Sequence, residues 1–306
     1  MADDLAAALR DAGAGDVADS ARLADLTTLR VGGPIGALVT AESDADLAAV
    51  GRVATARGLP WLVVGRGSNL LVADAGWPGI VISLGRGFRG VEIDGTRVHA
   101  GAAEPLPSLA VRIAGAGLGG FAWAAAVPGS LGGAVRMNAG AHGGEMSEAL
   151  VEVEVFRLRS STREVWPVGA LGLRYRHSEL PDDAVVVGAV LELPEADADT
   201  LRDEISEIRQ WRRDHQPINE PNCGSVFTNP PGDSAGRLVD AAGGKDLVVG
   251  GARISERHAN FIVTRPGATA QDVHDLIRMA RDRVADAFGI DLRPEVVMAG
   301  RFDEGG

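Results

Sequence analysis

The chain has 306 residues, 45% of them hydrophobic, and a formal net charge of −12 with a sequence pI near 5.0. Such a chain can bury a sizeable core, and its acidity argues against nucleic acid or an anionic membrane surface as a partner. Anionic small molecules stay open as ligands, because local arginines can bind them. The single cysteine, Cys223, excludes an internal disulfide and is typical of a reducing cytosol. The acidic start of the chain lacks the features of a signal peptide, so we expect a cytoplasmic protein.

Capping and turn signals define the first elements along the chain. Ser43 and Asp46 form a capping box that starts a helix through about residue 57, which Gly58 ends. Asp94-Gly95 between alternating residues predicts a β-hairpin over residues 91–98. The other expected elements, in chain order, are strands at 61–64, 80–84, 151–155 and 184–191, a linker at 195–199, a helix carrying Leu201, Ile205, Ile208 and Trp211 on one face, and a helix from Thr269 to Gly289 with Val273, Leu276, Ile277, Val284 and Phe288 on one face.

This order of elements predicts an α+β fold rather than one doubly wound sheet. We expect a first domain over residues 1–196, made of two lobes divided near residues 84–90, and a second domain over residues 197–306. Residues 113–135 carry no charge, but their seven glycines and Pro128 predict a buried or ligand-contacting loop rather than a membrane span.

Two apparent motifs, one for dinucleotide binding and one for a catalytic serine, lack residues or neighbouring elements that those motifs require. The string from Gly115 to Gly120 matches a dinucleotide fingerprint, but the residues before it favour a helix, not the strand that such a motif requires. Ser130 follows Pro128-Gly129, where a nucleophile elbow needs glycine two residues before the serine.

Three other glycine-rich segments, at residues 65–71, 128–134 and 138–145, suggest phosphate binding. Successive residues without large side chains let backbone N–H groups converge on a phosphate. The alternative is that these glycines only let strands approach closely.

Three short polar segments suggest chemistry on a carboxylate-bearing substrate. Arg176 supplies a fixed cation, Ser225 a hydroxyl just after Gly224, and Glu295 a carboxylate. Together they can hold a carboxylate and deliver a proton to the carbon beside it. Each also has a plainer interpretation, as a surface arginine, a turn serine and a solvated strand-end carboxylate.

In order and spacing these segments resemble the UDP-N-acetylenolpyruvoylglucosamine reductases of bacterial peptidoglycan synthesis, in the shorter branch that lacks an extra substrate-covering insertion. The resemblance runs from about Leu26 to Phe302. It implies a two-lobed FAD-binding domain of the vanillyl-alcohol-oxidase/PCMH type, followed by a C-terminal α+β substrate-binding domain. The residues it implies for FAD are Gly65, Arg66, Gly67, Ser68, Asn69, Leu70, Pro128, Gly129, Ser130, Gly132, Gly133, Asn138, Ala139 and Gly140.

The resemblance also implies the reaction, in which NADPH reduces, by way of FAD, UDP-N-acetylglucosamine enolpyruvate to UDP-N-acetylmuramate. Arg176 then binds the substrate carboxylate, Glu295 faces it, and Ser225 supplies the proton. Tyr175, Asn229, Lys245 and His258 are the implied substrate-binding residues, and no metal is implied.

The chain departs from many relatives at two positions. A lysine common in the family before Pro217 is replaced by the His215-Gln216 pair, and a common arginine is Val297. Two other functions stay open: a flavin-dependent oxidase of the same fold acting on another substrate, and a non-enzymatic nucleotide-sugar binding module.

Overall fold

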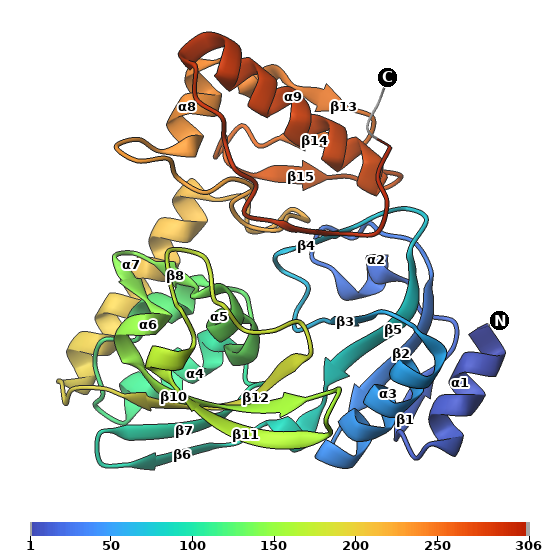
Figure 1. Ribbon diagram of the computed structural model, residues 1–306. Helices are drawn as coiled ribbons and strands as arrows, with labels where there is room; N and C mark the ends of the chain where they lie inside the picture. Colours follow the sequence, from blue (N-terminus) through green and yellow to red (C-terminus); the bar gives the residue numbers. More distant parts are fainter. Residues whose placement is uncertain (1, 304–306) are drawn as a thin grey trace. The chain divides into compact units, whose positions relative to one another are not determined.

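The computed structural model describes residues 2–303, which form two compact units (Figure 1). Each unit is assembled from separate stretches of the chain. Among the described residues, the first consists of residues 2–20, Gly36–Gly65 and Pro78–Trp211, and the second of Ala21–Ile35, Arg66–Trp77 and residues 212–303. These units differ from the expected division at residues 196 and 197, because two early segments belong with the C-terminal part of the chain. The domain boundary itself stays a prediction.

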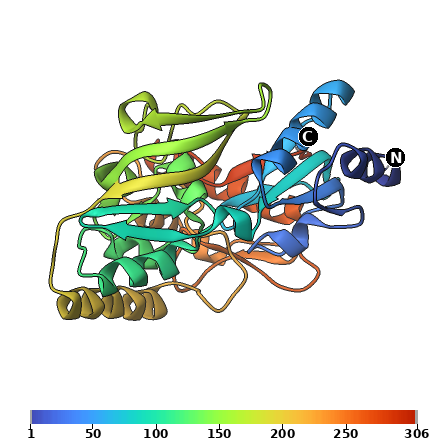
Figure 2. The ribbon, with the colours of Figure 1, turned by 90° about the horizontal axis from the view of Figure 1, so that it is seen from below.

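The first unit contains two sheets that follow one another in sequence. The four-stranded sheet has the order β1-β2-β5-β3, and the five-stranded sheet has the order β11-β10-β12-β7-β6. Figure 2 shows the strands of the second sheet side by side. The strands are β1 (Asp16–Ala18), β2 (Ile35–Ala41), β3 (Trp61–Val63), β5 (Trp77–Leu84), β6 (Val91–Asp94), β7 (Arg97–Gly101), β10 (Leu150–Arg157), β11 (Thr162–Pro167) and β12 (Ala184–Glu192), with the short pair β8 (Gly140–Ala141) and β9 (Gly144–Glu145) apart from both sheets.

Helices supply the apolar faces that cover these sheets. The predicted capping box at Ser43 is present, and Gly58 ends the helix in a left-handed conformation. The helices are α1 (Ala2–Asp11), α3 (Asp44–Arg57), α4 (Leu106–Gly115), α5 (Leu131–Met137), α6 (Met146–Ala149) and α7 (Ala198–His215), with 3-10 helices η1 (Arg86–Phe88), η2 (Ala122–Ala126) and η3 (Val168–Ala170).

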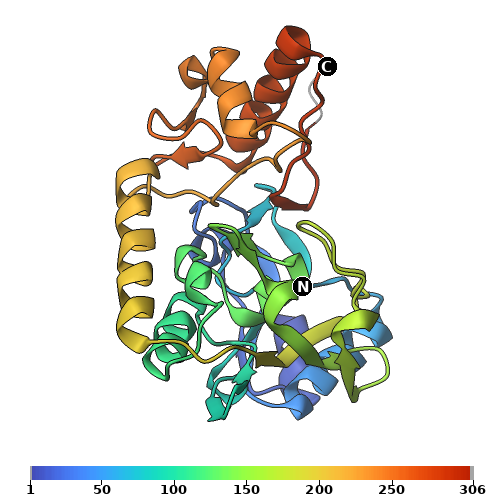
Figure 3. The same ribbon diagram turned by 90° about the vertical axis from the view of Figure 1, so that its left-hand side faces the viewer.

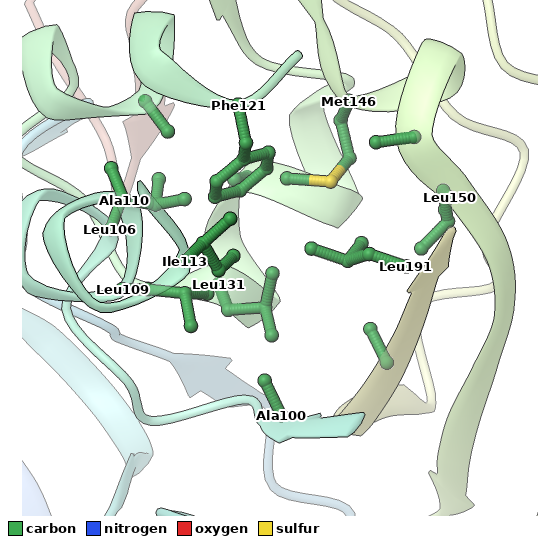
Figure 4. Packing of buried hydrophobic residues seen from close by; sticks show 14 of the residues in the cluster. Ala100, Leu106, Leu109, Ala110, Ile113, Phe121, Leu131, Met146, Leu150 and Leu191 are labelled. Atoms are coloured by element: carbon green, nitrogen blue, oxygen red, sulfur yellow. The ribbon is translucent and has the colours of Figure 1, made fainter. Parts of the chain in front are cut away.

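The core around the five-stranded sheet fixes helix α5, which leads into the site described below. Phe121, Leu131, Met146 and Leu191 are fully or almost fully buried and pack together (Figure 4). The uncharged run at 113–135 is therefore not one loop, as expected, but includes η2 and the start of α5. Gly132 and Gly133 are helical because burial of α5 in this core offsets the weak helical propensity of glycine.

The second unit is built around a small three-stranded sheet. Helix α9 packs against β13 and β14 and beside α8 (Figure 3), and Val273, Leu276 and Ile277 are buried in its core. Its elements are α2 (Leu23–Leu26), β4 (Leu70–Val72), α8 (Ala235–Ala241), η4 (Gly244–Asp246), β13 (Val248–Val249), β14 (Ala252–Ile254), β15 (Ile262–Thr264), α9 (Ala270–Phe288) and β16 (Val297–Ala299).

The ends of two expected apolar stripes are not core. Trp211 and Phe288 are each 41% exposed, although both follow the helical spacing of buried residues. Each lies in the last turns of its helix, where the buried face gives way to solvent. No helix in the described part of the chain combines the length and hydropathy that crossing a bilayer requires.

The capping box that starts α9 gives a stability prediction. Thr269 accepts a hydrogen bond from the N–H of Asp272, whose carboxylate in turn accepts the N–H of Thr269. Thr269→Ala should lower the free energy of unfolding by about 1 kcal/mol in a urea titration. Thr55→Ala, on the exposed face of α3, is the matched control and should leave stability unchanged or slightly raised. Equal losses in the two variants would contradict the assignment of the cap.

Candidate active site

Arg176 lies at the corner of a tight turn in the first unit. Arg174 and His177 exchange both backbone hydrogen bonds, at 3.0 and 2.9 Å, so Tyr175 and Arg176 form the turn between them. Arg176 has φ +55°, a left-handed conformation that costs a residue with a side chain about 1–2 kcal/mol. Contacts elsewhere must hold the turn in this shape.

Backbone carbonyls at the end of α5 hold the Arg176 guanidinium. Its Nη2 donates to the carbonyl of Gly140 at 2.6 Å, and its Nη1 donates to that of Asn138 at 3.5 Å. The guanidinium also lies over the Tyr175 ring, 4.8 Å from its centroid. Carbonyls near a helix C-terminus carry partial negative charge and favour a cation there. Arg176 is only half-buried, so a planar donor group is both fixed and accessible to an anion.

Helix α5 connects this turn to a predicted phosphate-binding segment. Ser130 caps the helix by accepting the N–H of Gly133 at 3.4 Å, and Asn138 ends it in a left-handed conformation. The N–H of Leu131 donates a hydrogen bond to the carbonyl of Glu104, and the N–H of Gly132 donates one to the carbonyl of Ala102. These two amides therefore stabilise the fold in the described conformation, and phosphate binding by the other amides of the segment stays a prediction.

The surface around Ser130 fits a phosphate-bearing cofactor for a different reason. A Cβ added to Gly65 would lie 2.5 Å from Ser130 Oγ, and one added to Gly133 would lie 3.4 Å from the same oxygen. Both glycines are exposed. A side chain at either position would cover the Ser130 hydroxyl, so the two glycines leave open a surface of backbone and hydroxyl groups on which the phosphate of bound FAD could be held.

Ser225 and Glu295 lie on neighbouring chain segments of the second unit. The N–H of Glu295 donates to the carbonyl of Val226 at 2.7 Å, and the N–H of Thr228 donates to that of Arg293 at 3.0 Å. Phe227 pairs with Pro294 in an isolated antiparallel bridge. This pairing sets Glu295 opposite Val226, so Ser225 and Glu295 lie one position apart on paired backbone segments, although about seventy residues separate them in sequence.

Asn260 stabilises that ladder and was missed by the sequence analysis. It is almost fully buried, its Oδ1 accepts the N–H of Phe227 at 2.9 Å, and its Nδ2 donates to the carbonyl of Phe227 at 2.8 Å. A side-chain amide thus replaces a missing strand neighbour. An asparagine directly before the apolar run Phe261-Ile262-Val263 was the available signal, since a buried amide needs backbone partners.

Asn69, predicted to bind FAD, is joined to the same ladder. Its Nδ2 donates to the carbonyl of Glu295 at 3.2 Å, and its own carbonyl accepts the N–H of Val297 at 3.2 Å. Leu70 then pairs with Val297 as β4 and β16 form a parallel pair. The predicted cofactor segment and the predicted catalytic carboxylate are therefore physically connected within the second unit.

The predicted substrate-binding residues have different surroundings. Tyr175 is 51% exposed, and Asn229 uses its Oδ1 to accept the N–H of Ala235 at the start of α8. Lys245 pairs with Asp240 at 2.7 Å. Burial, together with the positive charges of Lys245 and His215, lowers the pKa of His258. That effect identifies three basic groups close enough to interact, a suitable surrounding for an anion.

The structure divides the predicted catalytic residues between the units. Arg176 belongs to the first, and Ser225 and Glu295 belong to the second. The hydrogen bonds described above for each residue lie within its own unit. Within residues 2–303, no cluster of three His, Cys, Asp or Glu side chains has the arrangement that a metal ion needs.

The surroundings of Cys223 predict an unreactive thiol. It is 3% exposed, and burial, with a smaller contribution from the charge of Glu295, raises the pKa of Cys223 to about 12. At pH 8 only about one thiol in 10⁴ should be ionised. A thiol reagent such as DTNB should therefore label the native protein far more slowly than the urea-unfolded protein, which serves as the control. Native labelling at the rate of an exposed thiol would contradict this placement.

Comparisons with known families cover both parts of the chain. Residues 216–299 match the C-terminal domain of UDP-N-acetylenolpyruvoylglucosamine reductase, and residues 35–164 match an FAD binding domain. The protein named UDP-N-acetylenolpyruvoylglucosamine reductase in Heliobacterium modesticaldum is 46% identical over 286 residues, which cover 92% of this chain and 89% of that one. The protein of the same name in Methylorubrum populi is 41% identical and covers 98% and 96%.

A solved structure agrees over nearly the same length. The crystal structure of UDP-N-acetylenolpyruvylglucosamine reductase (MurB) from Thermus caldophilus is 38% identical, with a TM-score of 0.81 over 93% of this chain and 99% of that one. The expected fold class, an α+β chain with an FAD-binding domain followed by a C-terminal domain of the reductase type, is confirmed. The chain is an FAD-dependent oxidoreductase of peptidoglycan precursor synthesis, and it belongs to the UDP-N-acetylenolpyruvoylglucosamine reductase family.

Proposed function

We propose that this chain uses NADPH to reduce UDP-N-acetylglucosamine enolpyruvate to UDP-N-acetylmuramate in the cytoplasm. Its family membership over more than nine-tenths of its length supports the proposal. The observation that carries it is the pairing of the Ser225 and Glu295 segments through the 2.7 Å hydrogen bond from Glu295 to Val226. An oxidase of the same fold or a nucleotide-sugar binding module would not require a hydroxyl residue and a carboxylate residue on paired segments.

The reaction adds one hydride and one proton across a carbon–carbon double bond. Bound FAD would supply the hydride chemistry, with Gly65, Ser130 and Gly133 holding a phosphate of the cofactor. When hydride reaches the terminal vinyl carbon of the substrate, the electron pair of the double bond moves onto the carbon beside the carboxylate. The substrate becomes an enolate until that carbon accepts a proton, and the product is a lactyl ether.

Arg176 is proposed to stabilise the enolate. As the electron pair moves toward the carboxylate, its oxygens gain charge, and a planar guanidinium offers two parallel donors to them. The carbonyls of Asn138 and Gly140 hold this guanidinium before the substrate arrives. A donor group fixed in advance loses little reorganisation energy in the transition state.

Ser225 is proposed to deliver the proton, with Glu295 orienting the donor or the substrate. A serine hydroxyl is a weak acid, so its proton must move to a basic carbon while nearby donors stabilise the alkoxide. Asn260 binds the backbone of Phe227 and so fixes the backbone position of the Ser225 segment relative to the Glu295 segment.

The diphosphate of the substrate is proposed to meet the basic group formed by Lys245, His258 and His215. Burial, with smaller contributions from the charges of Lys245 and His215, lowers the pKa of His258, and a bound anion would oppose those charge contributions. Tyr175 and Asn229 are proposed to complete the substrate site. Many relatives carry a lysine before the proline where this chain has the His215-Gln216 pair, so His215 would keep a basic group in this region.

Ser225→Ala tests the function through its two half-reactions. Flavin reduction by NADPH in a stopped-flow instrument should stay close to the wild-type rate, because it requires no substrate protonation. Reoxidation by the enolpyruvyl sugar should slow by about 10²–10⁴-fold, the usual effect of removing a positioned acid.

Two further measurements make this test decisive. Ser225→Cys keeps an exchangeable proton and should retain part of the reoxidation rate, whereas a turn-only serine predicts no difference between the alanine and cysteine variants. Wild-type rates in both half-reactions of Ser225→Ala would refute the assignment of the proton donor. Failure of the wild-type protein to oxidise NADPH when the enolpyruvyl sugar is added would refute the proposed function.

A further inference from the structure

Asn138 is a buried residue in a conformation that most residues avoid. It ends α5 with φ +41° and ψ +55°, and it is fully buried. Asparagine tolerates the left-handed region better than other residues with a side chain, apart from aspartate. The sequence analysis predicts that it binds FAD, but full burial leaves its side chain no surface to offer a cofactor in the described conformation.

Both ends of the Asn138 amide bind backbone groups of the first unit. Nδ2 donates to the carbonyl of Arg174 at 3.1 Å, and Oδ1 accepts the N–H of Ser147 at 2.9 Å. The carbonyl of Arg174 also accepts the N–H of His177, which closes the turn. Asn138 therefore holds the base of the turn whose corner is Arg176.

The backbone of Asn138 contacts Arg176 as well. Its carbonyl, with that of Gly140, accepts hydrogen bonds from the guanidinium. The left-handed cap turns the chain at residue 138, so that this carbonyl and the side-chain amide reach the same turn. One residue thus constrains the strained backbone of Arg176 and the direction of its side chain.

Neighbouring anchors hold a different part of the same loop. Ser178 donates from Oγ to the carbonyl of Arg136 at 2.6 Å, and Arg136 donates from Nη1 to the carbonyl of Pro181 at 2.9 Å. Both contacts lie after the turn, and neither reaches Arg174. Loss of either weakens the loop but leaves the base of the turn in place.

We propose that Asn138 is a positioning residue, which acts through Arg176 and not as a contact of the cofactor. The inference rests on the proposed function, in which Arg176 stabilises the substrate enolate. Without the amide, the turn relaxes away from its left-handed corner and the guanidinium loses its fixed direction. A misplacement of about 1 Å in a group that stabilises a transition state can cost on the order of 100-fold in rate.

Asn138→Gly tests this, because glycine accepts the backbone conformation but removes the amide. Flavin affinity and the rate of flavin reduction by NADPH should stay within about 2-fold of wild type. Reoxidation by the enolpyruvyl sugar should slow by about 10–100-fold. If the glycine variant does not fold, Asn138→Asp serves instead, since its carboxyl group still accepts the Ser147 N–H but replaces the donor to Arg174 with an acceptor that repels the Arg174 carbonyl; the same split is expected.

Ser178→Ala is the matched control, since it removes a hydrogen bond between the same loop and the same helix. It should lower the Tm as the Asn138 variant does, but leave reoxidation near wild type. In an Arg176→Ala background, Asn138→Gly should cause little further slowing, because a residue that acts through Arg176 has nothing left to position.

The outcomes separate this inference from the function on which it rests. Unchanged reoxidation in Arg176→Ala would overturn the proposed role of Arg176. Slow reoxidation in Arg176→Ala with a normal rate in Asn138→Gly would overturn the positioning role alone. Loss of FAD affinity in Asn138→Gly, or full additivity in the double variant, would overturn it as well, the former in favour of a direct cofactor contact.

Discussion

A guanidinium held by carbonyl groups on a strained turn is the constraint on which the candidate site residues of the first unit depend. Arg176 sits in a left-handed conformation, and nothing in its own side chain favours that shape. The carbonyls of residues 138 and 140 fix it, and they are in place because α5 ends where it does. Burial of Leu131, Ala134 and Val135 against the five-stranded sheet in turn fixes α5. The hydrophobic core thus determines, through α5, the direction in which the Arg176 guanidinium points.

The candidate site residues of the second unit are held by backbone pairing instead. Ser225 and Glu295 come from segments far apart in sequence, and their strand pairing is too short to be stable without support. Asn260 supplies a side-chain amide as an additional partner, and Phe227 anchors the segment in the core of the second unit. Asn69 extends the same hydrogen-bonded group toward β4. Hydrogen bonds of Gly224 before the serine and of Val226 after it fix the backbone around Ser225. The Ser225 hydroxyl can still rotate about its side-chain bond.

The parts of the fold that could be predicted from the sequence are those defined by local signals, namely helix caps and turn residues. The capping boxes at Ser43 and Thr269 and the glycines after both helices define those helices from a few residues, because capping is a local interaction. The hairpin at Asp94-Gly95 follows from turn chemistry in the same way. Helix α5 was not predictable, since its Leu-Gly-Gly start has weak helical propensity and only tertiary burial makes it helical.

The candidate site was predictable in its residue types but not in its supports. Arg176, Ser225 and Glu295 follow from the chemistry of three polar segments and from family resemblance. Asn260, and the inward amide of Asn138, depend on which backbone groups the fold leaves without partners, and a sequence does not reveal that. The discontinuous second unit was missed for a related reason, because the pairing of β4 with β16 joins segments more than two hundred residues apart.

The most direct test of the central claim is the rate at which the enolpyruvyl sugar reoxidises the reduced flavin of Arg176→Lys under anaerobic stopped-flow conditions. Lysine keeps the charge but cannot offer two parallel donors to a carboxylate. If the carbonyl-held guanidinium stabilises the enolate, the variant should reoxidise about 10²–10³-fold more slowly while binding FAD as wild type does. Reoxidation at the wild-type rate would show that the paired donors of the Arg176 guanidinium have no part in the reaction.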